Sequence, residues 1–184
     1  MILPSHPDRK SKMELNEVYF WTNSIKDWHK IIWDSNKEII VNSLRYLVSR
    51  GKVKVFSFVI MPNHIHLIWK NISLNGKELP NASFSKFTSH EILKNIQNTN
   101  PEILNSFGVN EKDRKIRIWN RDPLAVLMDS RYKVEQKIRY IHENPLTEKW
   151  SLATSPEDYY WSSARFYETG IDQFGFLTHY IEEY

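Results

Sequence analysis

The stretch from residue 52 to residue 69 constrains the fold of this chain most, because it contains two apolar runs joined by a turn. The first run, residues 52–60, is dominated by Val, Phe and Ile, which favour strands. Pro62 and Asn63 favour a turn after it, and a second apolar run follows at residues 65–69. The sequence therefore predicts a β-hairpin whose second strand is buried.

Apolar residues at helical spacing predict three helices, at about residues 36–49, 83–97 and 129–144. Strand composition recurs at residues 17–22 and, as one or two short strands, within residues 116–127. The polar stretch at residues 98–115 is expected to be a loop or an insertion. The resulting order β-α-β-β-α-β-α predicts an α+β fold, with an antiparallel sheet and helices packed on one of its faces.

Length and composition limit the possible classes of protein. With 184 residues, 41% of them hydrophobic, the chain is expected to form one domain over residues 1–184, with an irregular lead-in at 1–16 and an aromatic extension at 150–184 packed on the body. The lack of cysteine excludes disulfides and thiolate metal sites. No apolar run approaches the roughly 20 residues of a membrane span, and the N-terminus lacks a secretory pattern, so we expect a cytoplasmic protein.

Charge and aromatic content are compatible with binding to nucleic acid. The net charge is +3, the sequence pI is about 8.9, and aromatic residues make up 14% of the chain. Exposed aromatic rings can stack on bases, although an aromatic core would use the same residue types.

Two histidines flank Ile65 in the predicted buried strand. Because successive side chains of a strand point to opposite faces, His64 and His66 point the same way, about 7 Å apart at the backbone. Imidazole is a common ligand of divalent cations, and two imidazoles at this spacing can converge on one ion. The two residues are therefore candidate metal ligands, although a histidine pair in a strand can also be incidental.

A second candidate feature lies in the third predicted helix. Its apolar stripe consists of Val134, Ile138 and Ile141, whereas Tyr140 and Asn144 share one face, a single turn apart. The amide oxygen of asparagine is a hard ligand suited to Mg²⁺ or Mn²⁺. A tyrosine hydroxyl becomes a nucleophile when it loses its proton, although most tyrosines are core or boundary aromatics. If this face meets the histidines, the sequence predicts a His-His-Asn metal site beside a tyrosine that could attack a phosphodiester.

The two motifs together resemble a known family. MPNHIHLIW (residues 61–69) matches the histidine–hydrophobic–histidine motif of the HUH single-tyrosine transposases. YIHENP (residues 140–145) matches their tyrosine-helix motif, particularly in the branch of REP-associated tyrosine transposases. The resemblance extends from about Tyr19 to Phe176 and includes the aromatic stretch EDYYWSSA (residues 157–164).

The resemblance implies that His64, His66 and Asn144 bind Mg²⁺ or Mn²⁺ and that Tyr140 is the nucleophile of a DNA transposase. Such an enzyme would cleave single-stranded DNA next to a hairpin repeat, keep the 5′ phosphate on the tyrosine and reverse the same chemistry for strand transfer. A ferredoxin-like (RRM-like) sheet, hairpin-bearing single-stranded DNA as partner, a monomer or homodimer and a nucleoid-associated location are also implied. Basic residues that could contact phosphates, or merely form a solvated face, are Lys112, Arg114, Lys115, Arg117 and Arg121.

Several alternatives stay open at the level of sequence. Tyr132 is a second possible nucleophile, with Gln136 four residues later as a possible ligand. His142 could replace Asn144 only if the helix were rotated, because it faces nearly away from Tyr140. The alternative function is that of a domesticated or inactive nucleic-acid-binding protein on the same fold. The sequence also leaves open whether one chain or two complete the site.

Overall fold

A five-stranded antiparallel sheet forms the centre of the protein in the computed structural model, which describes residues 9–10, 12–111 and 114–184. The strands follow one another across the sheet in the order β1-β7-β2-β4-β3. Their bounds are Arg9–Lys10 (β1), Val18–Ser24 (β2), Val53–Ile60 (β3), His64–Asn71 (β4) and Leu124–Leu127 (β7). The hairpin predicted at residues 52–69 is therefore formed by β3 and β4, which pair directly with each other.

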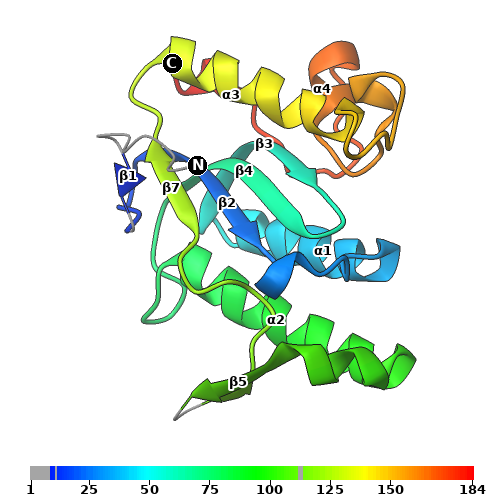
Figure 1. Ribbon diagram of the computed structural model, residues 1–184. Helices are drawn as coiled ribbons and strands as arrows, with labels where there is room; N and C mark the ends of the chain where they lie inside the picture. Colours follow the sequence, from blue (N-terminus) through cyan, green and yellow to red (C-terminus); the bar gives the residue numbers. More distant parts are fainter. Residues whose placement is uncertain (1–8, 11, 112–113) are drawn as a thin grey trace.

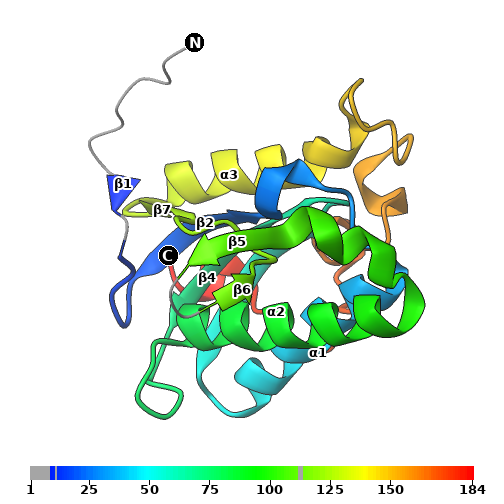
Figure 2. The same ribbon diagram turned by 60° about the horizontal axis from the view of Figure 1, so that its bottom comes forward.

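Three long helices cover the two faces of this sheet. They span Asp34–Ser49 (α1), Pro80–Thr99 (α2) and Arg131–Glu143 (α3). Figure 1 and Figure 2 show α1 and α2 on one side of the sheet and α3 on the other. The shorter elements are a helix at Ala164–Thr169 (α4), a two-stranded sheet of Gly108–Glu111 (β5) and Arg114–Ile116 (β6), and 3₁₀ turns at Lys26–Trp28, Pro101–Phe107, Asn144–Leu146, Pro156–Asp158 and Tyr180–Glu182. None of the helices within the described ranges combines the length and the apolar character that crossing a membrane requires.

The predicted α+β fold is confirmed. The elements β2, α1, β3, β4, α2 and β7 follow one another as β-α-β-β-α-β, which is the order of a ferredoxin-like fold. The structure differs from the prediction in one detail, because helices cover both faces of the sheet rather than one. The reason lies in β4, where Ile65 and Leu67 are buried on one face and His66 and Ile68 on the other. A strand buried on both faces needs a layer on each, and α3 supplies the second layer.

The stretch at residues 98–115, predicted as a loop or an insertion, contains regular structure. A 3₁₀ turn ends at Phe107, and β5 pairs with β6 directly after it. Phe107 is fully buried, and its ring centroid lies 4.9 Å from that of His29. Ile103 and Leu104 also pack against the core, so a few apolar side chains anchor a largely polar segment. The polar majority is why composition favoured a loop.

The C-terminal segment covers the outer edge of β3. The backbone NH of Ile60 donates to the carbonyl oxygen of Trp161 (2.9 Å), and the backbone NH of Thr178 donates to that of Val55 (2.9 Å). An exposed strand edge is a template for pairing with another chain. The segment therefore occupies an edge at which aggregation would otherwise begin.

Candidate active site

His64 and His66 lie on the face of the sheet that α3 covers. β4 pairs with β2 on one side and with β3 on the other, so the backbone of both histidines is fixed. Their side chains are 7% and 5% exposed, and their ring centroids are 4.8 Å apart. The two rings share one face, as the alternation of side chains along a strand requires.

Each imidazole is oriented by a hydrogen bond at its Nδ1 atom. His64 Nδ1 donates to Asn63 Oδ1 (2.7 Å), since an amide oxygen can only accept. His66 Nδ1 lies 2.7 Å from Thr22 Oγ1 on the neighbouring strand. The Nε2 atom of His64 therefore carries a lone pair, and that of His66 accepts from Asn144 Nδ2 at 3.3 Å. Histidines that bind metal ions are commonly held in this way, with the second nitrogen fixed by a partner.

Burial keeps both histidines neutral near pH 7. It lowers the pKa of His64 to about 4, and the positive charge of Lys149 acts in the same direction. Burial also lowers the pKa of His66 well below its usual value, with smaller effects from His64 and Lys137. A neutral imidazole is the form that binds a cation, so the pair already has the protonation state of a metal site.

The candidate for a third ligand is an uncharged side chain. Across residues 9–10, 12–111 and 114–184, no three His, Cys, Asp or Glu side chains cluster in a way that could hold an ion. Asn144 is within hydrogen-bond distance of His66 and is itself 8% exposed. Its amide oxygen is therefore the candidate for a third donor beside the two imidazoles.

Tyr140 projects from α3 beside His66. Its ring centroid lies 5.3 Å from that of His66 and 6.0 Å from that of Phe20. The Nζ atom of Lys137 lies 5.2 Å from the centroid of the Tyr140 ring and 4.8 Å from that of the Phe20 ring. Tyr140 is 47% exposed, so a substrate can reach it although it contacts a buried histidine.

The sequence of α3 explains why Tyr140 and Asn144 face the histidines. The helix buries its predicted apolar stripe, Val134, Ile138 and Ile141. With this stripe against the sheet, Tyr140 and Asn144 share the adjoining face one turn apart. Within one chain, all four predicted site residues thus lie close together.

The structure keeps Tyr132 and His142 away from this meeting point. Tyr132 is 66% exposed, and its hydroxyl accepts from Gln136 Nε2 (2.7 Å), so it bonds along its own helix. His142 points to another side of α3, where its Nε2 atom lies 2.8 Å from Ser163 Oγ and 3.3 Å from Ser57 Oγ. Its burial lowers its pKa to about 4. His142 is therefore a structural residue and does not replace Asn144.

The side chains of two of the five predicted phosphate contacts are described, and neither lies at the histidines. Lys112 lies outside the described residues, and Arg114 and Lys115 are described only as part of the backbone of β6. Arg117 and Arg121 line a groove of about 900 Å³ between α2 and the segment after β6. The position of a basic residue in the sequence does not tell on which face of the fold it lies. Arg117 and Arg121 lie on a different face from the histidines.

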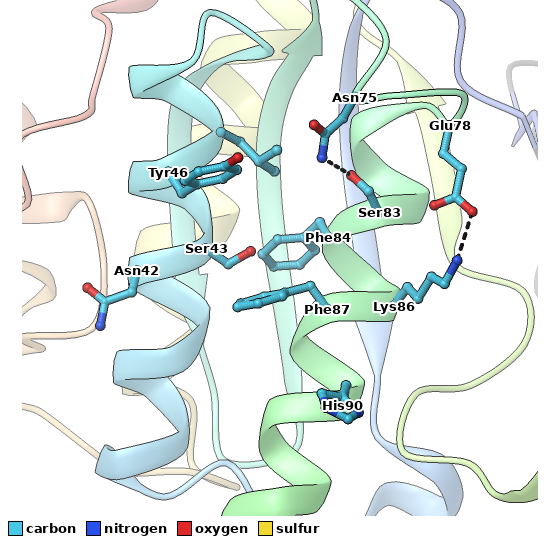
Figure 3. A pocket seen from close by; sticks show the side chains of 11 residues that line it. Asn42, Ser43, Tyr46, Asn75, Glu78, Ser83, Phe84, Lys86, Phe87 and His90 are labelled. Atoms are coloured by element: carbon cyan, nitrogen blue, oxygen red, sulfur yellow. Dashed lines mark hydrogen bonds and ion pairs between the residues drawn. The ribbon is translucent and has the colours of Figure 1, made fainter.

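Two grooves lie on the α1–α2 side of the sheet. Asn23 lines the groove that contains Arg117 and Arg121, and its Nδ2 atom lies 3.5 Å from Ser85 Oγ of α2. A second groove, of about 570 Å³, separates α1 from α2, and Figure 3 shows Phe84 and Phe87 pointing from α2 towards the helix that carries Tyr46. Both grooves are separated from the histidine pair by the sheet.

Sequence reasoning missed the groups that surround the histidines. Asn63 and Thr22 orient the two imidazoles, while the ring centroids of Trp28 and Trp150 lie 6.1 Å and 5.8 Å from that of His64. Asn63 could have been found, because it directly precedes His64 in the chain. The two tryptophans could not, since they are far apart in the sequence and meet only in the fold.

Comparison with known proteins supports the fold. The chain matches no family model and no curated protein sequence. It is similar to the solved structure of a REP-associated tyrosine transposase bound to a REP hairpin, with a TM-score of 0.58 and 14% identity over 91% of this chain and 88% of that chain. A putative transposase from Deinococcus radiodurans R1 aligns with a TM-score of 0.44 and 14% identity over 73% of this chain and 95% of that chain. The first likeness shows a shared fold and confirms, at that level, the resemblance predicted from the two motifs.

Proposed function

We propose that the protein is a metal-dependent single-strand DNA endonuclease and strand transferase, a transposase of the REP-associated tyrosine type. It would cleave DNA next to hairpin repeats through a covalent 5′-phosphotyrosine. The observation that carries this proposal is the meeting of β4 with the end of α3. Asn144 Nδ2 lies 3.3 Å from His66 Nε2, and the ring centroid of Tyr140 lies 5.3 Å from that of His66.

The donor set fits a divalent cation such as Mg²⁺ or Mn²⁺. His64 and His66 would each offer an Nε2 lone pair, and Asn144 would offer its amide oxygen. Both imidazoles are neutral and are held at Nδ1 by fixed partners, so binding an ion requires little reorganisation. A bound ion would polarise the phosphodiester that is to be cleaved.

Tyr140 supplies the nucleophile in this proposal. Its hydroxyl oxygen attacks phosphorus, the bond between phosphorus and the 3′ oxygen breaks, and the hydroxyl proton reaches that 3′ oxygen through solvent. One strand remains joined to Tyr140 by its 5′ phosphate, and the other ends in a 3′-hydroxyl. Joining a 3′-hydroxyl to the phosphotyrosine is the reverse reaction, so strand transfer needs no energy source.

The substrate is inferred from the relative that shares the fold. That transposase is bound to a REP hairpin. We infer that this chain likewise acts on single-stranded DNA next to a hairpin, because its half-exposed tyrosine can accept an unpaired strand at the edge of α3.

The test is formation of a covalent protein–DNA adduct. The protein is incubated with hairpin-bearing single-stranded DNA and Mn²⁺ and then denatured, and we expect a DNA-linked band that disappears in Tyr140→Phe. Tyr132→Phe is the matched control, since it removes an exposed hydroxyl two turns away on the same helix. Loss of the adduct in Tyr132→Phe alone would overturn the choice of nucleophile. Binding of hairpin DNA without an adduct on any substrate would favour the alternative of a non-catalytic nucleic-acid-binding protein.

A further inference from the structure

The two histidines of the site have different neighbours. His66 contacts the proposed nucleophile, whereas His64 lies beside two tryptophan rings, those of Trp28 (6.1 Å between centroids) and Trp150 (5.8 Å). The Nζ atoms of Lys30 and Lys149 each lie 5.2 Å from the Trp150 ring. We call Trp28, Trp150, Lys30 and Lys149 the tryptophan rim. The chemistry proposed above uses none of these four residues.

Trp28 is presented to solvent by a strained turn. Its side chain is 57% exposed, which is unusual for the largest apolar residue. Its backbone has a φ of 59°, and that of Asp27 has a φ of 53°, so two consecutive residues other than glycine adopt the left-handed conformation. Bulky residues rarely adopt it, and such strain is concentrated at functional sites, where surrounding contacts maintain it.

Asn63 maintains this turn and at the same time connects it to β4, the strand that begins at His64. Its Nδ2 atom donates to the carbonyl oxygen of Trp28 (2.9 Å), while its Oδ1 atom accepts from His64 Nδ1 (2.7 Å). Asn63 is 3% exposed, and its hydrogen bond to His64 is buried, whereas that to Trp28 is partly buried. One buried amide therefore fixes an exposed tryptophan relative to a proposed metal ligand.

The charge of the rim is positive. Lys30 and Lys149 are exposed and flank the Trp150 ring. The carboxylate in the Trp28 turn, that of Asp27, pairs with Lys26. Aromatic rings interleaved with lysines are the usual surface for single-stranded nucleic acid, because bases stack on the rings and phosphates lie against the ammonium groups.

We infer that the tryptophan rim binds the nucleotide that carries the leaving 3′ oxygen, with its base stacked on Trp28. The inference rests on the proposed function, and its polarity follows from the order of the rings, with Tyr140 beside His66 and Trp28 beside His64. In a displacement at phosphorus, the attacking and leaving oxygens lie roughly in line on opposite sides. The strand whose 3′ oxygen leaves therefore extends away from Tyr140, towards the rim.

This assignment gives the rim a role after cleavage. The strand with the 5′ phosphate is then held covalently by Tyr140, but the strand with the 3′-hydroxyl is held only by non-covalent contacts. Stacking on Trp28 keeps that hydroxyl next to the phosphotyrosine. Trp28 is thus expected to affect rejoining more than the first attack.

The first experiment measures stacking without any cleavage. It uses Tyr140→Phe protein and two short single-stranded DNA oligonucleotides, one with 2-aminopurine at its 3′ end and one with 2-aminopurine at its 5′ end. We expect quenching of the 3′-terminal probe when the protein binds. Trp28→Ala should abolish this quenching and weaken binding by roughly 5- to 150-fold, which is the range for stacking of one base. Trp28→Tyr should restore most of the effect. Phe87, on the opposite face of the sheet, is 51% exposed, and Phe87→Ala should change neither the quenching nor the binding.

Several outcomes would overturn the inference. A response of the 5′-terminal probe alone to Trp28→Ala would reverse the polarity. Equal losses of DNA binding in Trp28→Ala and Phe87→Ala would show that the effect is nonspecific. Tighter binding of RNA of the same sequence would make RNA the occupant of the rim. Circular dichroism of Trp28→Ala checks that the fold is retained.

A second experiment uses the active protein and separates this inference from the proposed function. In Trp28→Ala, the KM of a 3′-hydroxyl strand in rejoining should rise at least about fivefold, with a smaller change in adduct formation at saturating DNA. If no variant forms an adduct but the 3′-terminal probe still responds to Trp28→Ala, the rim inference stands and the proposed catalysis fails. If the adduct forms but neither probe responds to Trp28→Ala, the proposed catalysis stands and the rim inference fails.

Discussion

Asn144 Nδ2 lies 3.3 Å from His66 Nε2, although 78 residues separate the two in the chain. This contact joins the end of α3 to the middle of the sheet and brings the face of Tyr140 with it. An amide can present either an N–H group or a carbonyl oxygen, so the side chain that donates to a bare imidazole can also ligate an ion held by that imidazole.

Substitution of Asn144 tests its role as a ligand. Asn144→Ala should lower the rate of adduct formation roughly tenfold or more, because one donor of the cation is lost, while Asn144→Asp should keep most of the rate because a carboxylate oxygen also binds Mg²⁺ and Mn²⁺. The rate is measured during a titration with Mn²⁺. Equal losses in the two variants would contradict a ligand role.

Removal of the metal should stop the reaction and leave the fold intact. After treatment with a chelator we expect no adduct, and addition of Mn²⁺ or Mg²⁺ should restore it, since the histidines are neutral and oriented before an ion binds. The adduct is followed on a denaturing gel and the fold by circular dichroism. An undiminished adduct in the chelated protein would exclude a metal requirement.

Thr22 is expected to raise the metal affinity of the proposed site by orienting His66. Thr22→Val keeps the shape of the side chain but removes the hydroxyl group 2.7 Å from His66 Nδ1. Loss of such an orienting partner typically lowers metal affinity or activity by about 10- to 100-fold. Calorimetric titration with Mn²⁺ measures the affinity. Thr169→Val is the control, because the exposed Thr169 hydroxyl bonds only to backbone groups at the end of α4, away from the histidines. A similar loss there would point to a general effect of threonine substitution.

His142 should make the protein less stable in acid. Burial lowers its pKa from 6.5 to about 4, so the unfolded chain takes up a proton at a higher pH than the folded protein does. Above pH 6.5 the group has no effect on stability. As the pH falls from 6.5 to 4, its contribution lowers the free energy of unfolding by up to about 3 kcal/mol.

The measurement for His142 is urea unfolding at a series of pH values. The free energy of unfolding of the wild-type protein should fall as the pH decreases from 6.5 to 4. In His142→Gln this fall should be smaller but still present, because His64 and His66 are also buried and neutral. His90→Gln, at an exposed position of α2, serves as control. An unchanged fall in His142→Gln would be incompatible with the lowered pKa.

Ser163 is predicted to stabilise the interface between β3 and α3. Its Oγ atom accepts from the backbone NH of Phe58 (3.0 Å) and lies 2.8 Å from His142 Nε2. Ser163→Ala removes the side-chain acceptor of the Phe58 NH and one of the two serine partners of His142 Nε2, and should cost about 1–3 kcal/mol. Thermal or urea unfolding measures the loss, and Ser151→Ala, at an exposed serine, should cost much less.

Local periodicity explains which features could be predicted from the sequence. The hairpin of β3 and β4, the shared face of His64 and His66, and the stripe of α3 depend on spacings of two to four residues, which a sequence displays directly. The face that α3 covers depends on contacts between distant segments, as do the positions of Arg117 and of Trp28. Such contacts leave no local pattern, so these features appear only in the fold.

The C-terminal segment that lies along the edge of β3 also fixes the rotation of α3 about its own axis. Successive helical residues are turned by about 100°, so holding His142 against Ser163 determines the direction in which Tyr140 and Asn144 project. A small rotation would carry both side chains away from the histidines without breaking the helix. The segment that carries Ser163 therefore sets the direction of the proposed nucleophile, although Ser163 itself belongs neither to the proposed metal site nor to the tryptophan rim.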